Sequence, residues 1–259
     1  MKDYKSCTVV MTTYSNNDFT NASVWALRRF YPDIKIIFAD GHPTIPFSAG
    51  YQMWENDDEG KVDNSRLVWL PGACTEDCRN AAMALVDTEY GLLMDNDVKV
   101  IASDAIPLCL EVFEKHLKAA ATGWYGLVVT DWYRHKAYVG TEFFDHINLD
   151  ATQATFSLHR TDVYRAVGGM PKQPFWDGCP PDILEGYHPA YMGDFTICRR
   201  YAEAGFEIIS PRKTLPILHW TQAIAWQKDK EMDSIAKWVQ DNATHTRINP
   251  LNDWRYDER

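Results

Sequence analysis

Short, continuously apolar segments alternate with amphipathic segments through the first 100 residues of this chain. The apolar segments span residues 6–14, 32–41, 66–72 and 90–95. The amphipathic segments carry apolar residues at helical spacing, namely Val24, Leu27 and Tyr31 in one and Ala82, Met83 and Val86 in the other. Strands that are apolar throughout are buried on both faces, so helices must cover both sides of their sheet. The pattern therefore predicts an α/β fold with a mostly parallel central sheet.

Polar residues indicate where the helices should begin. Thr20 or Asn21 can cap the first helix, because their side-chain oxygens accept hydrogen bonds from the N–H groups of a first turn. Thr75 and the two acidic residues after it should start the second helix, since acids stabilise a helix N-terminus. A third helix is expected to be capped at Ser103. Its apolar stripe would consist of Ile106, Leu110, Phe113 and Leu117.

The segment from residue 101 to residue 222 predicts a mixed arrangement of strands and helices. Strands are expected at 125–130, 154–159, 206–210 and 215–220, and helices at 161–167 and 194–204. A Pro- and Gly-rich loop, residues 170–189, precedes the second of these helices. The final residues, 223–259, contain one amphipathic segment and predict a helical C-terminal extension.

Composition limits the environment and the partners of the protein. With 259 residues, 46% of them hydrophobic, the chain can bury one large core. It contains no run of roughly 18 apolar residues, so we expect no transmembrane segment. Because it has no signal-peptide layout and its six cysteines are scattered, we expect a cytoplasmic protein. The net charge of -10 argues against general attraction to a polyanion such as DNA.

Polar residues follow the predicted parallel strands at the points where the strands end. Thr12, Thr13 and Tyr14 end the first strand, Asp40 ends the second, and Asp95 and Asp97 end the fourth. Ligands of open α/β sheets bind beyond the carboxyl ends of the strands, so these residues should converge on one crevice. Two carboxylates there would repel each other and need a cation such as Mg2+ or Mn2+. An Asp-x-Asp triplet can also be a simple turn or helix cap.

Several segments occur in an order that resembles a known enzyme family. They are "TVVMTTYSN", "YPDIKIIFADGHP", "PGACTEDCRNAAMALVDTEYGLLMDNDVKV", "FSLHRTDVYRAVGGMP", "GDFTICRRYAEAGFEIIS" and "LPILHW". Together they cover roughly residues 6 to 220 and resemble a family 2 glycosyltransferase of the GT-A fold. The resemblance implies one catalytic domain over residues 1–222, with a Rossmann-like nucleotide-sugar-binding half at 1–100 and an acceptor half at 101–222.

The resemblance also implies roles for individual residues. The donor nucleotide sugar would contact Thr12, Thr13, Tyr14, Asp40, Arg79, Asn80, Asp95 and Asn96. Asp95 and Asp97 match the metal-binding triplet, with Asp97 the favoured direct ligand, and His219 matches a further metal ligand of some members. Asp194 matches the catalytic base of inverting members. Mn2+ or Mg2+ is the implied cofactor.

Each of these assignments has a simpler alternative. Asp40 can open a turn before a glycine, and Arg79 can be a solvated helix residue. Asp194 can be only an N-cap, and His219 can be a core histidine at the end of a strand. The sequence also departs from the family at two places. In "GDF" a glycine stands where the family has an acid immediately before Asp194, and at residues 39–40 "AD" replaces a double acid.

These observations predict a metal-dependent, inverting and non-processive glycosyltransferase, since the Gln-x-x-Arg-Trp motif of processive synthases is absent from the sequence. UDP-sugars are the favoured donors, and a saccharide or glycoconjugate hydroxyl is the expected acceptor, with a hydroxylated DNA base as a minority option. Phe175 and Trp176 are the candidate acceptor platform, although aromatic residues of this kind also serve in cores. The alternatives are a sugar-nucleotide nucleotidyltransferase and a noncatalytic carbohydrate-binding domain.

Overall fold

A computed structural model gives the fold of most of the chain. It describes residues 3–14, 17–44, 64–124, 126–131, 136–139, 146, 148–170 and 193–219. The acceptor-platform candidates Phe175 and Trp176 and the predicted C-terminal helix within 223–259 lie outside the described residues.

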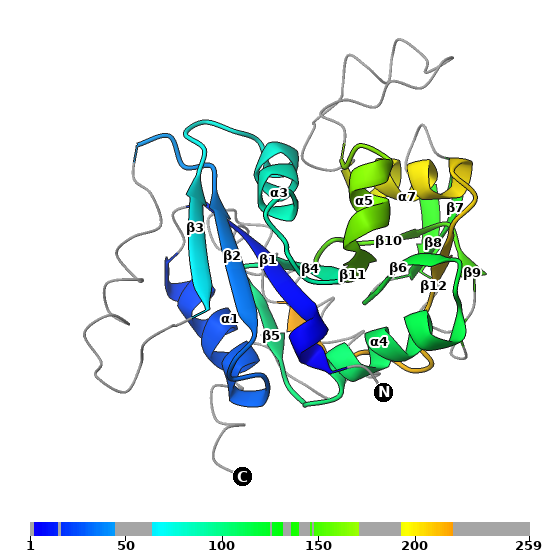
Figure 1. Cartoon of the computed structure of the whole chain (residues 1–259), viewed down its shortest axis with the longest axis horizontal. Helices are drawn as coiled ribbons and strands as arrows, with labels where there is room; N and C mark the ends of the chain where they lie inside the picture. The colour runs from blue at the N-terminus through cyan, green and yellow to red at the C-terminus, as the bar shows by residue number, and fades with distance from the viewer. Residues whose placement is uncertain are drawn as a thin grey trace, which may run out of the picture.

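One large sheet organises the structure (Figure 1). In spatial order its strands are β3 (Ser65–Trp69), β2 (Lys35–Asp40), β1 (Cys7–Thr13), β4 (Tyr90–Asp95), β11 (Phe156–Arg160), β6 (Ala119–Gly123), β12 (Glu207–Ile209) and β9 (Asn148–Leu149). The first four strands run parallel, whereas β11 pairs antiparallel with both β4 and β6. The predicted α/β fold, with a mostly parallel first half and a mixed second half, is confirmed.

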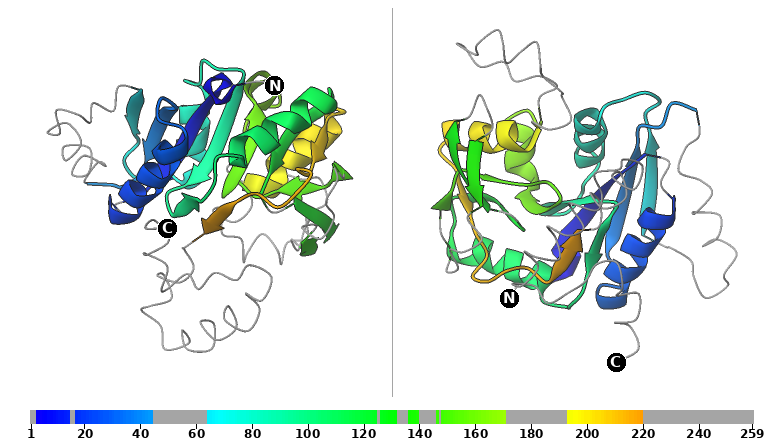
Figure 2. Two further views of the ribbon diagram at one scale, coloured as in Figure 1. Left: turned by 90° about the horizontal axis from the view of Figure 1, so that it is seen from below. Right: turned by 180° about the vertical axis from the view of Figure 1, so that it is seen from behind.

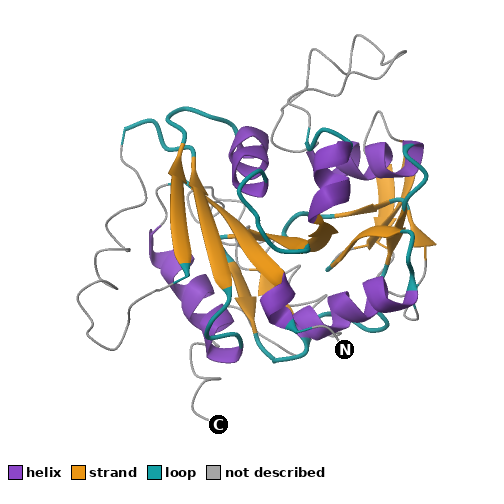
Figure 3. Cartoon of the chain, in the orientation of Figure 1, coloured by secondary structure: helices purple, strands orange, loops and turns teal. Residues whose placement is uncertain are grey.

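Helices cover both faces of this sheet, as Figures 2 and 3 show. One face packs against α1 (Asn17–Phe30) and α4 (Ala105–Lys115), and the other packs against α3 (Thr75–Met83), α5 (Thr161–Ala166) and α7 (Gly193–Glu203). The alternation along β1 shows why both layers are needed. Val9 and Met11 belong to the first core, and Val10 between them belongs to the second.

Two smaller sheets complete the described structure. The strands β7 (Gly126–Asp131), β8 (Lys136–Val139) and β10 (Ala151–Thr152) form one of them. The other pairs β5 (Val98–Val100) with β13 (Ile217–His219) in antiparallel register, so that His219 lies opposite Val98. A 3-10 turn, η1 (Tyr4–Ser6), precedes β1. The pairing of β5 with β13 brings the end of the described chain next to the acidic triplet.

Some boundaries differ from the sequence predictions. The helix α1 begins at Asn17, so Thr20 and Asn21 lie within it and neither is its cap. Asp104, rather than Ser103, is the N-cap residue of α4. This helix ends at Lys115, which leaves Leu117 beyond the apolar face and 80% exposed.

Five strands, namely β5, β6, β8, β9 and β10, were not predicted from the sequence. The strand β6 reads "AAATG", in which Thr122 is the one β-branched residue and no residue is aromatic, so it has little of the composition that is typical of strands. Its strand conformation comes from its position between β11 and β12, which bond to it on both sides. The strand β5 has only three residues and depends on β13 as its partner.

Within the described part of the chain, no helix is both long enough and apolar enough to cross a membrane.

Candidate active site

The carboxyl ends of the parallel strands bring the predicted polar residues to one edge of the sheet. In the register of β1 with β2, Thr13 lies opposite Asp40. In the register of β1 with β4, Thr12 lies opposite Asp95. Neighbouring parallel strands therefore place three segments that are distant in sequence next to each other.

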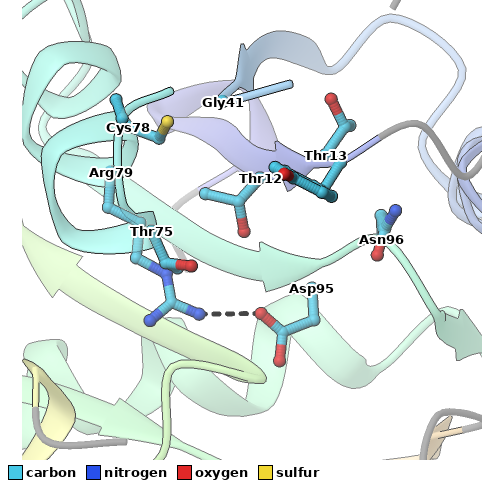
Figure 4. Close-up of a pocket in the computed structure, with 10 residues that line it drawn as sticks. Thr12, Thr13, Gly41, Thr75, Cys78, Arg79, Asp95 and Asn96 are labelled. Atoms are coloured by element: carbon cyan, nitrogen blue, oxygen red, sulfur yellow. Dashed lines mark hydrogen bonds and ion pairs between the residues drawn. The ribbon is translucent and has the colours of Figure 1, made fainter. Parts of the chain in front are cut away.

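A cavity of about 380 Å³ opens at this edge (Figure 4). Its lining consists of Thr12, Thr13, Tyr14, Gly41, Ala73, Thr75, Cys78, Arg79, Asp95 and Asn96. Six of the predicted donor residues thus share one cavity. Two others, Asp40 and Asn80, are not part of this lining.

Arg79 is the central cation of the site. It lies on α3, whose predicted start at Thr75 is confirmed, and its side chain is almost completely buried. Its Nη2 atom donates a hydrogen bond of 2.7 Å to Asp95 Oδ1, and its Nη1 atom donates one of 3.3 Å to Asp194 Oδ1. Figure 4 shows the contact with Asp95 as a dashed line. Burial by itself would lower the pKa of Arg79, but the two carboxylates outweigh it, so the guanidinium stays charged.

The acidic triplet and His219 form a second cluster next to Arg79. Ligand atoms of Asp95, Asp97 and His219 all lie within 4.8 Å of one another, and His219 Nε2 lies 3.3 Å from Asp97 Oδ1. Asp97 Oδ1 is buried and has no hydrogen-bond partner among the described residues. A buried carboxylate oxygen without a donor, next to a second carboxylate and an imidazole, fits a divalent cation. The residues present therefore suit Mn2+ or Mg2+.

The middle residue of the triplet anchors the turn. Asn96 Nδ2 donates to Thr20 Oγ1 at 3.0 Å, and Ser23 Oγ donates to the backbone carbonyl of Asn96 at 2.8 Å. Both partners belong to α1. Helix α1 thereby fixes the backbone between Asp95 and Asp97, even though Asn96 itself lines the cavity.

Asp194 lies in the first turn of α7 on the far side of Arg79. Its Oδ2 atom accepts the backbone N–H of Ala154 at 3.0 Å, and its Oδ1 atom accepts from Arg79. Because α7 already begins at Gly193, Asp194 is not the cap that the simpler alternative required. Burial raises the pKa of Asp194, while Arg79 and the Ala154 N–H act in the opposite direction. A carboxyl group tuned in this way can accept a proton from a hydroxyl.

Asp40 and Asn80 have local partners. Asp40 Oδ1 accepts the backbone N–H of His42 at 2.7 Å, which is the turn contact expected from the simpler alternative, but its buried Oδ2 has no hydrogen-bond partner among the described residues. The Asn80 side chain accepts from Tyr164 at 2.8 Å and from the backbone N–H of Met170 at 2.9 Å. It also donates to the carbonyl of Met170 at 2.6 Å. Asn80 therefore joins α3 to the end of the segment after α5.

Glu76 belongs to the same buried cluster, and the sequence indicated it only as an acid of the first turn of α3. Its side chain is 0% exposed, and its charge acts on both Arg79 and Asp194. No sequence signal could distinguish it from Asp77, the other first-turn acid, because its environment includes Gly193, which is distant in sequence.

Comparisons with known proteins identify the fold. No family model and no curated protein matches this chain. Among solved structures, the mannosyltransferase PcManGT from Pyrobaculum calidifontis, in complex with GDP-Man and Mn2+, matches with a TM-score of 0.61 and 14% identity over 94% of this chain and 64% of its own. GalNAc-T7 with UDP, GalNAc and Mn2+ matches with a TM-score of 0.60 and 9% identity over 82% of this chain and 43% of its own.

A third solved structure is also similar in fold. The structure of residues 1–349 of S. aureus TarS in complex with UDP-GlcNAc has a TM-score of 0.55 and 12% identity, over 82% of this chain and 57% of its own. This chain spans less than two thirds of the length of all three structures. The fold is therefore that of the GT-A-like glycosyltransferases, as the sequence resemblance predicted.

Proposed function

We propose that this chain is a metal-dependent glycosyltransferase that moves a hexosyl group from a nucleoside diphosphate sugar to an acceptor hydroxyl. The observation that carries the proposal is the single guanidinium of Arg79 between Asp95, at the end of β4, and Asp194, on α7. This arrangement brings a carboxylate of the triplet and a candidate base to the two terminal nitrogens of one buried cation. The neighbouring structures contain GDP-Man, UDP with GalNAc, and UDP-GlcNAc, which supports a nucleotide-sugar donor for this chain.

The donor would lie in the cavity at the sheet edge. Thr12, Thr13 and Tyr14 line the side formed by β1, where the nucleotide would bind, and Arg79 and Asp95 line the side where the diphosphate would lie. Asp40 was predicted to contact the ribose or base, but it is fully buried and does not line this cavity, so it is left out of the proposed donor contacts. UDP-sugars remain the favoured donors.

Asp95, Asp97 and His219 would hold Mn2+ or Mg2+. When bound, the cation would neutralise negative charge on the leaving diphosphate. Arg79 supplies a second positive charge on the same side, and it is fixed by its two ion pairs before any substrate arrives. A cation held in place in this manner costs little reorganisation during the reaction.

Asp194 would act as the general base. As the acceptor oxygen bonds to C1 of the sugar, its proton passes to Asp194, and the bond between C1 and the phosphate oxygen breaks to release a nucleoside diphosphate. Attack opposite the leaving group gives inversion without a covalent intermediate. The acceptor is proposed to be a saccharide or glycoconjugate, and transfer is proposed to be non-processive. No disulfide joins the cysteines that the structure describes, which supports a cytoplasmic site of action.

Ligand-linked stability tests the donor and the metal. We expect the unfolding temperature to rise with the correct sugar nucleotide only when Mn2+ is present, since a ligand at about 100 times its Kd adds about 2.7 kcal/mol. The Asp97→Asn variant is the control for the metal and should lose the shift. If no sugar nucleotide in a panel of UDP- and GDP-sugars gave a shift with Mn2+, the proposal would be wrong.

Turnover tests the base. Release of nucleoside diphosphate from the donor should require Mn2+, and Asp194→Asn should still bind the donor but transfer the sugar at least ~100-fold more slowly. Full turnover by Asp194→Asn would exclude Asp194 as the base. Release of pyrophosphate from a nucleoside triphosphate would instead identify a nucleotidyltransferase, and binding without any turnover would identify a carbohydrate-binding domain.

A further inference from the structure

Glu76 is a buried carboxylate without a strong hydrogen-bond donor. Its side chain is 0% exposed, and among the described residues no nitrogen or hydroxyl donor reaches either Oε1 or Oε2. The thiol of Cys74 contacts Glu76: burial, the charge of Glu76 and a hydrogen bond to the Glu76 side chain all raise the pKa of Cys74, but a thiol is a weak donor. Burying an unpaired carboxylate opposes folding. A residue that destabilises the fold in this manner is a candidate for a role in the site.

The carboxylate of Glu76 occupies the space beside the start of α7. A Cβ atom added to Gly193 would lie 3.0 Å from Glu76 Cγ and 3.2 Å from Glu76 Oε1, which is closer than ordinary packing allows. Glycine at position 193 therefore leaves room for Glu76, which reaches from α3 into the place that a side chain before Asp194 would fill.

The charges around Asp194 are unequal. Arg79 on α3 is a cation, whereas Glu76 on α3 and Asp95 on β4 are acids, and all three act on Asp194. Tyr164 on α5 and Cys198 on α7 also lie near it. If Arg79 paired with Asp194 alone, its positive charge would lower the proton affinity of Asp194. Asp194 would then be a poor base. A further negative charge near the guanidinium counteracts that effect.

We propose that Glu76 is a positioning residue of the acid–base centre, whose carboxylate fills the space beside Gly193 and balances Arg79 so that Asp194 stays available to accept a proton. This inference rests on the proposed function of Asp194 as the base. Glu76 itself touches no substrate, because it is fully buried and does not line the cavity. A merely structural role would be different: as a first-turn acid, Glu76 would only stabilise the N-terminus of α3.

The Glu76→Gln variant separates the two roles, because it keeps the shape of the side chain and removes its charge. We expect the acidic limb of the pH profile of kcat/KM to move to measurably lower pH, since a like charge near Asp194 has been removed. We also expect a melting temperature equal to or above that of the wild type, because the buried unpaired charge is gone. Glu76→Asp keeps the charge and should keep the limb near its wild-type position. Glu114→Gln, the same change at an exposed site on α4, is the matched control.

A direct titration keeps this test independent of turnover. The carboxyl carbon signal of Asp194, identified by its loss in Asp194→Asn, should titrate at measurably lower pH in Glu76→Gln than in the wild type, with Mg2+ present in both. An unchanged midpoint, or a marked fall in melting temperature with an unchanged midpoint, would overturn the inference. If the wild type turned over no sugar nucleotide, the proposed function would fail, but the titration would still decide whether Glu76 tunes Asp194.

Discussion

The imidazole of His159 should make the folded chain sensitive to mild acid. His159 lies in the middle of β11 and is buried, with Nε2 2.8 Å from Ser157 Oγ and Nδ1 3.0 Å from Tyr201 Oη. Burial, aided by the positive charge of Arg79, lowers the pKa of His159 from 6.5 to about 3. Tyr201 belongs to α7, the helix that carries Asp194, so the same contact supports the candidate base.

The sign and size of the effect follow from proton linkage. Below pH 6.5 the unfolded chain binds a proton at His159, whereas the folded chain does not bind it until the pH falls to about 3. Stability is therefore lost as the pH falls through this window, by at most about 1.4 kcal/mol per pH unit. Between pH 7 and pH 4.5 the loss due to His159 amounts to roughly 2–3 kcal/mol, a large part of the stability of a typical domain.

The His159→Gln variant tests this estimate, because an amide can still bond to Ser157 and Tyr201 but does not titrate. Urea unfolding of the variant and the wild type at pH 7 and pH 4.5 gives four free energies of unfolding. The wild type should lose roughly 2–3 kcal/mol more than the variant over this range. His116→Gln, at a partly exposed histidine, is the control and should behave as the wild type. Equal losses in the wild type and His159→Gln would refute the reasoning.

Three further outcomes test the metal cluster and the packing. Asp97→Asn and His219→Gln, tested separately by calorimetry, should each weaken Mn2+ binding by at least ~10-fold, because each removes one ligand of the three-residue cluster. Unchanged Mn2+ affinity in both variants would exclude this cluster as the metal site. Ser23→Ala removes the 2.8 Å hydrogen bond to the Asn96 carbonyl. Mn2+ affinity should fall by a few fold, while the free energy of unfolding changes by about 1 kcal/mol or less. A loss of stability without a loss of Mn2+ affinity would limit Ser23 to a structural role. Gly123→Ala would place a Cβ atom 2.5 Å from the hydroxyl of Thr152 and 2.7 Å from the carbonyl oxygen of Phe156. The free energy of unfolding in urea should therefore fall by about 1–3 kcal/mol. An unchanged free energy would mean that β6 can shift to make room.

Local patterns in the sequence were sufficient for the first half of the fold. Continuous apolar runs predicted the parallel strands, of which β1, β2 and β4 are buried on both faces while the edge strand β3 is only partly buried. Helical spacing predicted the helices between them. The strand β6 escaped prediction because its conformation is imposed by two neighbouring strands and not by its alanines. Leu117 was misassigned because the sequence does not show that α4 ends two residues earlier.

The candidate site also combines features that local sequence predicts with contacts that depend on packing. The sequence alone determined that Thr12, Asp40 and Asp95 meet at one edge, because parallel strands end on the same side of their sheet. The position of Arg79 between Asp95 and Asp194 follows from packing and not from local sequence, since the contact with Asp194 joins residues 115 positions apart and depends on where α7 lies. The burial of Glu76 beside Gly193 was decided in the same way. Short-range periodicity reports which face of an element is apolar, whereas the partner of a buried charge is set by packing between elements that are distant in sequence.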